Sequence, residues 1–177
     1  MAVYYEYLIS SLPMLIFATK APFSFDYFLS MCEDKIPQRQ LLLLKKIAET
    51  EVFLQSVGQK TLDRWINFEI ALRNELVKAR SARKKIEPQK FLRPESELEF
   101  GLHHIAMHAV RMPSLIEAEK YLDSQRWNKL DELVQGHFFD FDFLVVYALK
   151  LKILLRWQEI EEVKKEELFK ETIVAIG

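Results

Sequence analysis

The chain has 177 residues, of which half are hydrophobic and 29% are charged, so it contains enough apolar material for a globular core. Its 25 basic and 26 acidic residues give a formal net charge of −1, which excludes a global attraction to nucleic acid or to membrane lipids. Only four glycines and six prolines are present, and so few turn residues argue against a many-stranded β fold and predict long helices. The single cysteine, Cys32, excludes an internal disulfide and is expected to be a small buried hydrophobe.

Two apolar stretches need a decision about membranes. Residues 8–19 are mostly apolar, but Glu6 stands where a signal peptide has its basic residues. Residues 143–155 are interrupted by Lys150 and Lys152, which a spanning helix would not carry. We therefore expect no direct membrane insertion and a cytoplasmic location, either free or peripheral at the cytoplasmic face of the inner membrane.

The N-terminal segment is expected to be an extended arm. Residues 4–11 are rich in aromatic and branched side chains, which favour an extended backbone. Pro13 and Pro22 prevent one continuous helix through the arm. Ser24 is a suitable N-cap for a helix that runs to about Glu33.

The next two helices are predicted from proline, glycine and apolar spacing. One is expected to begin near Pro37 and to end at Gly58. Its buried side chains would be Leu43, Leu44, Ile47, Ala48 and Leu54. Thr61 would cap the second helix, which has two apolar stripes and should therefore pack against two neighbours. The first stripe is Trp65, Phe68, Leu72, Leu76 and Ala79, and the second is Ile66, Ile70 and Val77.

The following segment is expected to be a loop or hinge and then another helix. Residues 87–94 contain two prolines and are predicted to form the loop. A helix from Glu95 to about Arg111 should follow, and Pro113 should stop it. The residues of that helix expected to face inward are Leu98, Leu102, Ile105 and Ala109.

The C-terminal third is predicted to contain four helices. Ser114 and Glu117 form a capping-box pattern, and Ser124 is expected to cap a second short helix that ends before Gly136. Residues 138–143 would form an aromatic turn in which Asp140 or Asp142 caps a long helix to about Ile160, and residues 161–175 would form a final charged helix. Buried residues of the long helix should include Leu144, Tyr147, Leu151 and Leu155.

Together these elements predict an all-α fold. We expect a multi-helix bundle of six to eight helices with an extended N-terminal arm, organised as a single helical domain over residues 1–177.

Three histidines are the only metal-like cluster in the sequence. His104 and His108 follow His103 and are four residues apart, so they share a helix face and could chelate zinc. A zinc-dependent hydrolase would also need a third ligand and a base, and the glutamate that follows the first histidine in metalloprotease helices is absent. A structural pair at the edge of a buried stripe is favoured, and the hydrolase stays as the alternative. We predict no metal and no cofactor.

The strongest local charge is the basic run of residues 78–93, in which seven cations accompany one acid, Glu87. The run could be a solvated helix end, because cations favour the C-terminal end of a helix dipole. It could also bind an acidic protein or, as a further alternative, a phosphate or nucleic acid. No aromatic residues alternate with the cations as in a base-stacking platform, so nucleic acid is not the expected partner. The residues predicted to bind a partner are Arg80, Arg83, Lys84 and Lys85.

No catalytic motif is recognisable. The sequence has no glycine-rich phosphate loop, no nucleophile elbow and no cysteine–histidine arrangement, so we predict that the protein is not an enzyme. The aromatic residues around 138–147 could line a ligand pocket, but an aromatic cluster that covers a helix start is more common.

Four stretches of sequence resemble a small family of bacterial proteins encoded beside V-type (A/V-type) ATPase subunits. They are residues 4–13, residues 21–29, Trp65 with residues 72–76 and Arg80, and residues 122–130 through Leu151 to Trp157. That family looks like a shortened relative of the C-type subunit of V-type ATPases, which is the d-type subunit in eukaryotes and forms an all-helical socket between the central shaft and the rotor ring. The resemblance implies a non-enzymatic subunit or accessory factor that binds V-type ATPase central-stalk or rotor subunits through helix faces. It implies no catalytic residues, and the chain is about half the length expected of the full d-type subunit.

Overall fold

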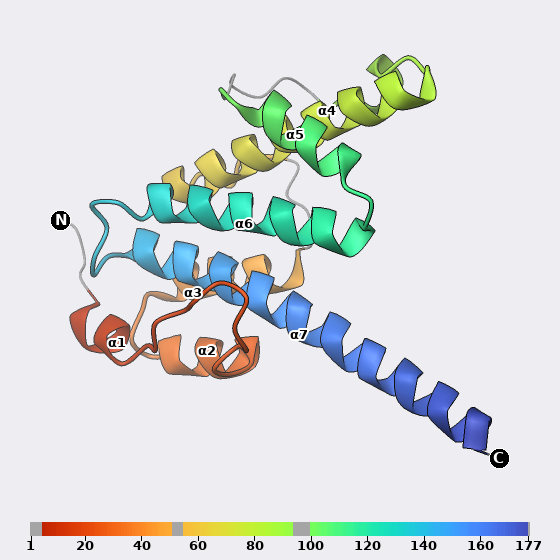
Figure 1. Cartoon of the computed structure of the whole chain (residues 1–177). Coiled ribbons are helices and arrows are strands. Elements are labelled where there is room, and N and C mark those ends of the chain that lie inside the picture. Colours follow the sequence, from red (N-terminus) through yellow and green to blue (C-terminus); the bar gives the residue numbers. More distant parts are fainter. Residues whose placement is uncertain (1–4, 51–54, 94–99, 177) are drawn as a thin grey trace. The chain divides into compact units, whose positions relative to one another are not determined.

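The computed structural model describes residues 5–50, 55–93 and 100–176, with side chains as far as residue 164 (Figure 1). These residues form α-helices, one 3-10 turn and loops, and no strand occurs among them, which confirms the all-α prediction. The chain divides into two compact units. One comprises residues 1–51 and 137–177, and the other comprises residues 52–136. The organisation as a single domain stays a prediction. No helix among the described residues is long and apolar enough to cross a membrane.

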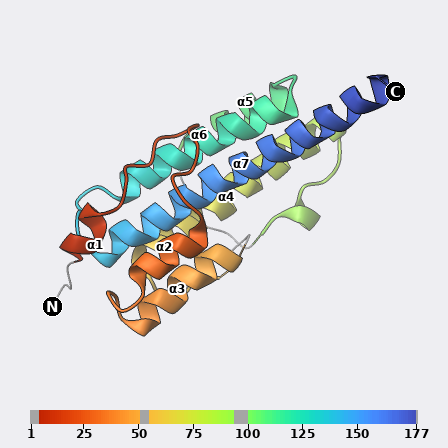
Figure 2. The same cartoon turned by 90° about the horizontal axis from the view of Figure 1, so that it is seen from below.

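The first unit is built on the C-terminal helix. It contains α1 (Glu6–Ser10), α2 (Phe25–Cys32), α3 (Gln38–Glu49) and α7 (Phe141–Ile176). The helices α2 and α3 pack against each other, and both pack against α7 (Figure 2). Cys32 is completely buried there, as predicted, and burial raises the pKa of its thiol to about 12.

The start of the chain differs from the predicted extended arm. The extended form predicted for residues 4–11 is wrong over Glu6–Ser10, which form α1; Tyr4 lies outside the described residues. The branched side chains Leu8 and Ile9 are buried in this unit, and tertiary packing of this kind overrides a weak β preference. Tyr5 anchors the segment, because its hydroxyl donates to Gln40 Oε1 at 2.7 Å.

The cap of α2 agrees with the sequence, whereas the end of α3 does not. The Ser24 hydroxyl accepts a hydrogen bond from the backbone N–H of Tyr27, as expected of an N-cap. The helix α3 was predicted to reach Gly58 but ends at Glu49. Lys152 of α7 explains this early end, since its ammonium donates to three backbone carbonyls in the last turn of α3 and just after it. The carbonyls belong to Ile47, Ala48 and Thr50, at 2.9, 3.3 and 2.6 Å.

The residues that α3 buries are also partly different from the predicted ones. Leu44 and Ile47 are buried as predicted, together with Leu41. Leu43 and Ala48 are half-buried, and Leu54 lies outside the described residues.

The helix α7 is longer than predicted. It was expected to end near Ile160 before a separate helix, but it runs without a break to Ile176. Asp140 caps it, as proposed, because its Oδ1 accepts the backbone N–H of Phe143 at 3.1 Å. Leu144, Tyr147 and Leu151 are buried as predicted, whereas Leu155 is half-buried.

The aromatic residues near the start of α7 form a packed cluster around Tyr147. The Tyr147 ring lies 5.3 Å from that of Phe28 and 6.3 Å from that of Phe143, between ring centroids. Its hydroxyl donates to the Pro13 carbonyl at 2.9 Å, and burial raises the pKa of this hydroxyl. The cluster agrees with the favoured interpretation of an aromatic core, although Phe138 is exposed and takes no part in it.

The second unit packs three helices together. It contains α4 (Lys60–Lys84), the 3-10 turn η1 (Gln89–Phe91), α5 (Leu102–Arg111) and α6 (Leu115–Leu133), and each of the three α-helices contacts the other two.

The helix α4 buries both predicted stripes, except that Val77 is half-buried. Its predicted cap is wrong. The side chain of Gln59 accepts the N–H of Leu62 at 2.6 Å, and Thr61 is buried inside the first turn.

Two predicted boundaries after α4 are also wrong. The helix α5 begins at Leu102 and not at Glu95; residues 94–99 lie outside the described part. The residue before it, Gly101, has a φ of 85°, a left-handed backbone that favours glycine and cannot continue a helix. The helix α6 is continuous where a second helix was predicted, because the Ser124 hydroxyl donates back to the Tyr121 carbonyl within the helix. Ser114 does cap α6, as expected.

A buried ionic network joins α4 to α6. Asp123 is completely buried, and its Oδ1 lies 2.9 Å from Arg126 Nη1. The Nε of Arg126 lies 2.7 Å from Glu69 Oε1 on α4. Burial lowers the pKa of the Arg126 guanidinium, but the two carboxylates more than offset burial, so that its pKa is raised overall. No sequence pattern indicated this network, since the three residues are ordinary surface types.

Candidate partner-binding surface

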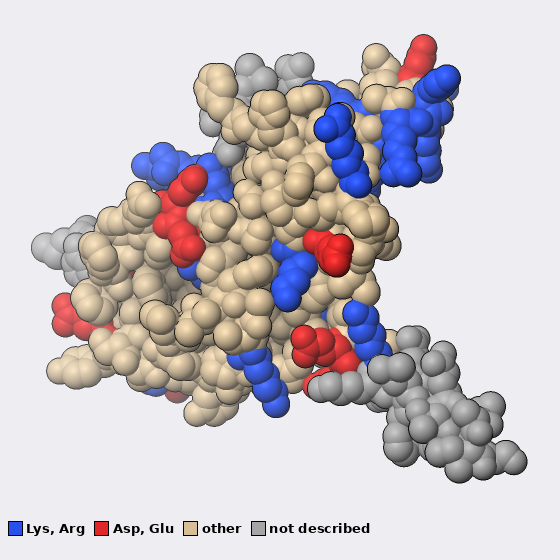
Figure 3. All heavy atoms as spheres, viewed as in Figure 1, with Lys and Arg blue, Asp and Glu red and all other residues tan. Residues whose placement is uncertain are grey.

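The four predicted partner-binding residues lie at the C-terminal end of α4. Arg80, Arg83, Lys84 and Lys85 are all exposed, as predicted. Lys85 ends the helix in a left-handed conformation with φ of 54°. Figure 3 shows lysine and arginine side chains gathered over this end of α4. We call these four residues the basic end of α4.

A groove runs beside the basic end, between α4 and the segment that leads through η1. Its α4 wall is one helical face, because the residues are spaced by four, three, one and three positions. The side chains that line it are Arg73, Val77, Arg80, Ser81 and Lys84 from α4, and Ile86 and Phe91 from the following segment. We call this feature the α4 groove. Ile86 is 51% and Phe91 is 57% exposed, so two large apolar side chains stand in solvent beside three cations.

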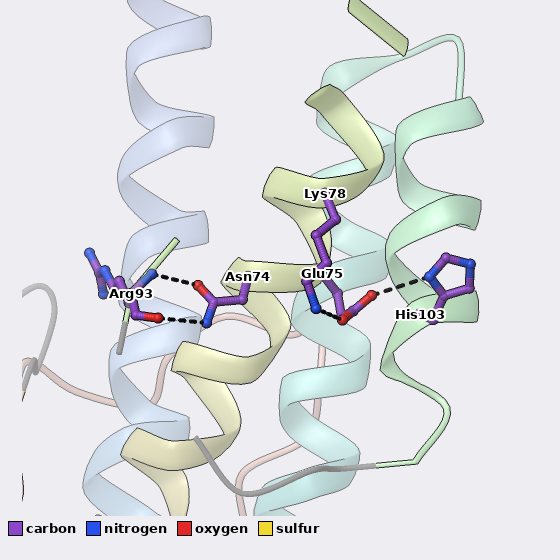
Figure 4. Close-up of polar contacts among 5 residues, drawn as sticks. All are labelled: Asn74, Glu75, Lys78, Arg93 and His103. Carbon is purple, nitrogen blue, oxygen red and sulfur yellow. Dashed lines mark hydrogen bonds and ion pairs between the residues drawn. The ribbon is translucent and has the colours of Figure 1, made fainter. Parts of the chain in front are cut away.

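Asn74 holds the far wall of the α4 groove in place. Its Oδ1 accepts the backbone N–H of Arg93 at 2.9 Å, and its Nδ2 donates to the Arg93 carbonyl at 3.2 Å (Figure 4). Both polar groups of one backbone residue are thus bound by one side chain of α4. The pair of bonds fixes where the chain runs after Phe91, two residues away.

On the other side of α4, Glu75 binds two cationic partners. Its carboxylate lies 2.7 Å from Lys78 Nζ and 3.2 Å from His103 Nδ1 on α5 (Figure 4). Partial burial raises the pKa of Glu75, but Lys78 and His103 outweigh it and lower the pKa overall. Glu75 is therefore engaged with α5, on a different side of α4 from the groove.

The cations of the groove have no acidic counterpart among the described residues. No carboxylate lines the groove, and Arg73, Arg80 and Lys84 form no ion pair in the part of the chain that the structure describes. The pKa of the Arg93 guanidinium is lowered, first by burial and then by the neighbouring charge of Arg73, which Glu69 offsets only in part. The groove is thus a site of uncompensated positive charge in a chain with a net charge of −1.

The candidate zinc histidines lie elsewhere on α5 and do not form a three-ligand group. His104 is exposed, and the ring of His108 packs against Tyr121 with 4.7 Å between centroids. His103 is held by Glu75. No metal-like group that includes these histidines is present among the described residues.

A different metal-like group occurs at the start of α7, where the sequence suggested only a helix cap. Ligand atoms of His137, Asp140 and Asp142 lie within 4.8 Å of one another. Both oxygens of Asp140 are engaged, one by His137 Nδ1 at 2.6 Å and the other by the N–H of Phe143. The positive end of the α7 dipole also opposes a cation at this position. The geometry is that of a capped helix start.

The histidine pair gives a direct test of the zinc alternative. We expect that His104→Ala combined with His108→Ala leaves the metal content of the purified protein unchanged, because neither side chain belongs to a ligand group in the described residues. The melting temperature should shift by no more than about 2–4 °C, the size expected for ~1 kcal/mol in a chain of this length. Elemental analysis and a thermal melt measure both quantities. Stoichiometric zinc that disappears in the double variant would instead establish a zinc site.

Sequence reasoning found only part of the groove. Arg73 is seven residues before Arg80 and shares its helix face, so helical spacing could have identified it. The contributions of Ile86 and Phe91 depend on how the chain folds back along α4, for which the sequence carries no signal.

Comparison with known proteins gives one match. No curated protein and no solved structure matches the chain. Residues 51–177, well over half of the chain, match the sequence model of a family described as "Protein of unknown function (DUF2764)", and this range contains the whole α4 groove. The chain therefore belongs to the DUF2764 family, whose function is unknown.

Proposed function

We propose that this protein is a non-enzymatic subunit or accessory factor of a V-type ATPase, which docks through the basic end of α4 on an acidic surface of a central-stalk or rotor subunit. The resemblance of four sequence stretches to proteins encoded with this ATPase supports the choice of partner. The observation that supports the docking surface is the exposure of Arg80, Arg83, Lys84 and Lys85 together at one helix end.

The physical role of such a cluster is in association. Exposed charges contribute little to folding, but a local concentration of one sign steers an oppositely charged partner and fixes its orientation. Two of the four cations, Arg83 and Lys84, also lie in the last turn of α4, where they favour the helix dipole. That contribution is about 0.3–1 kcal/mol and leaves most of the charge available to a partner.

Charge reversal tests the proposal. The variant Arg80→Glu, Arg83→Glu, Lys84→Glu and Lys85→Glu is expected to slow association with purified ATPase subunits by about tenfold or more at low salt, because electrostatic steering is lost. The difference should shrink as salt rises from ~0.1 M to ~1 M, over which the screening length falls from about 10 Å to about 3 Å. Biolayer interferometry against each ATPase subunit measures the rates.

A matched variant separates the local effect from the change in net charge. Reversal of Lys20, Arg39, Lys46 and Lys120, four exposed cations elsewhere, changes the formal net charge equally, by −8 from −1 to −9. It should bind ATPase subunits faster than the variant of the basic end. Equal rates for the two variants would show that the basic end is only a solvated helix end. If the wild type binds no ATPase subunit, the proposed function is wrong, and salt-dependent binding to nucleic acid would then favour a phosphate-binding module.

A further inference from the structure

The α4 groove combines two properties that a solvated helix end does not need. Three cations follow one face of α4, and Ile86 and Phe91 expose apolar surface directly beside them. Large apolar side chains that stand together in solvent are costly and usually mark a binding surface. Uniform solvation would account for the cations but not for the apolar wall.

We propose that the α4 groove binds an acidic amphipathic helical segment of a partner protein. Carboxylates of that segment pair with Arg73, Arg80 and Lys84, and its apolar side covers Val77, Ile86 and Phe91. The proposal deepens the proposed function, on which it rests for the identity of the partner, by naming the chemistry that is recognised.

The length of the groove sets the length of the segment. Arg73 and Lys84 are eleven residues apart on α4, which corresponds to ~16 Å of helix axis at about 1.5 Å per residue. A partner helix of about three turns matches this distance. Its carboxylates would recur at intervals of four and seven residues, the intervals that place side chains on one helix face. Recognition of an apolar helix face in a groove is a recurring mode of peptide binding.

The polarity of the occupant follows from the charges on both sides of α4. Acidic Glu75 is already bound by Lys78 and His103, so it does not neutralise the groove. Arg73 lies close enough to Arg93 to lower the pKa of that guanidinium, which means that positive charge is concentrated without compensation. A carboxylate-bearing partner relieves this repulsion, whereas a basic partner would increase it.

The apolar wall is fixed before any partner arrives. The two hydrogen bonds from Asn74 to the backbone of Arg93 hold the chain that follows Phe91 against α4. A wall that is already ordered lowers the entropy cost of binding. Asn74 is therefore a positioning residue of the groove and need not contact the partner.

Two paired variants separate the groove from the basic end. Arg73→Glu with Phe91→Ser changes only groove residues, whereas Arg83→Glu with Lys85→Glu changes only residues outside the groove. All four side chains are exposed, so both variants should fold normally, which a far-UV spectrum and a thermal melt verify. We expect the groove variant to weaken binding to the ATPase partner by about tenfold or more, as for the loss of a central contact.

The outcomes distinguish this proposal from the proposed function. If only the variant outside the groove loses affinity, docking on the ATPase stands and the groove proposal is overturned. If the wild type binds no ATPase subunit, the proposed function fails, and photocross-linking from Phe91 decides the groove by itself.

Photocross-linking identifies the occupant. A photoreactive benzoylphenylalanine is placed at Phe91, inside the groove, or at Phe138, which is also exposed but lies in the other unit. After irradiation in the native host, mass spectrometry should find a partner peptide with carboxylates and apolar residues at helical spacing, cross-linked at position 91 and not at 138. Addition of Arg73→Glu should reduce the yield at least about fivefold, because one of the three carboxylate pairings is replaced by repulsion.

Three results would overturn the groove proposal. One is a cross-linked peptide of neutral or basic character. Another is a cross-link only to the acidic residues 95–99 of the same chain. The third is co-sedimentation of the purified protein with vesicles of phosphatidylcholine and phosphatidylserine, lost in the groove variant, with no peptide cross-link at position 91.

Discussion

Leu151→Ala is expected to lower the free energy of unfolding by ~2–5 kcal/mol, the usual range for a buried leucine whose removal leaves a cavity. Leu151 is completely buried in α7, the helix against which α2 and α3 pack. Because these helices meet on α7, the cavity would weaken the packing of the whole first unit. Urea unfolding followed by circular dichroism measures the change.

The loss should be confined to one unit. Hydrogen exchange in the Leu151→Ala variant is expected to accelerate in α2, α3 and α7 more than in α4–α6, because the clusters of contacts are separate. Leu42→Ala on α3 is the matched control, since Leu42 is 56% exposed and its truncation should cost less than about 0.5 kcal/mol. An equally small cost for Leu151→Ala would contradict the assignment of α7 as the core of this unit.

Arg126→Met should be nearly as damaging in the second unit, with an expected cost of about 3–5 kcal/mol at neutral pH. Arg126 neutralises the completely buried carboxylate of Asp123 and also binds Glu69 on α4. Methionine fills a similar volume but leaves the Asp123 charge buried without its partner. Denaturant unfolding measures the loss.

A double variant tests that the buried charge is the cause. Asp123→Asn added to Arg126→Met removes the charge and should recover much of the lost stability, which a loss of packing alone would not allow. Lys120→Met, on the same helix but exposed, should change stability by less than about 0.5 kcal/mol. If the double variant is less stable than Arg126→Met, the network is not stabilised by charge neutralisation.

Local signals predicted the beginnings of several helices correctly. Ser24, Ser114 and Asp140 cap α2, α6 and α7 as expected, because an N-cap depends on a side chain and a backbone N–H only three residues away. The buried stripe of α4 was also predicted, since apolar spacing of three and four residues is a property of one helix.

Helix lengths and ends were predicted less well. The end of α3 depends on Lys152, which lies about a hundred residues later in the sequence and binds the carbonyls of that last turn. The sequence suggested a new helix after Ser124, but its hydroxyl is bound within a continuous α6. These outcomes are decided by contacts between or within elements for which no local pattern exists.

The sequence by itself determined the helical class, the absence of recognisable catalytic motifs and the concentration of cations that became the basic end of α4. These properties depend on composition and on residues close together in the chain, so local spacing is enough to reveal them. Only the tertiary structure decided that Asn74 holds the backbone of Arg93, that Ile86 and Phe91 stand beside Arg73, and that Asp123 is buried against Arg126. The physical reason differs for each: the groove depends on where the chain folds back along α4, and the burial of a charged residue depends on the helix that packs over it.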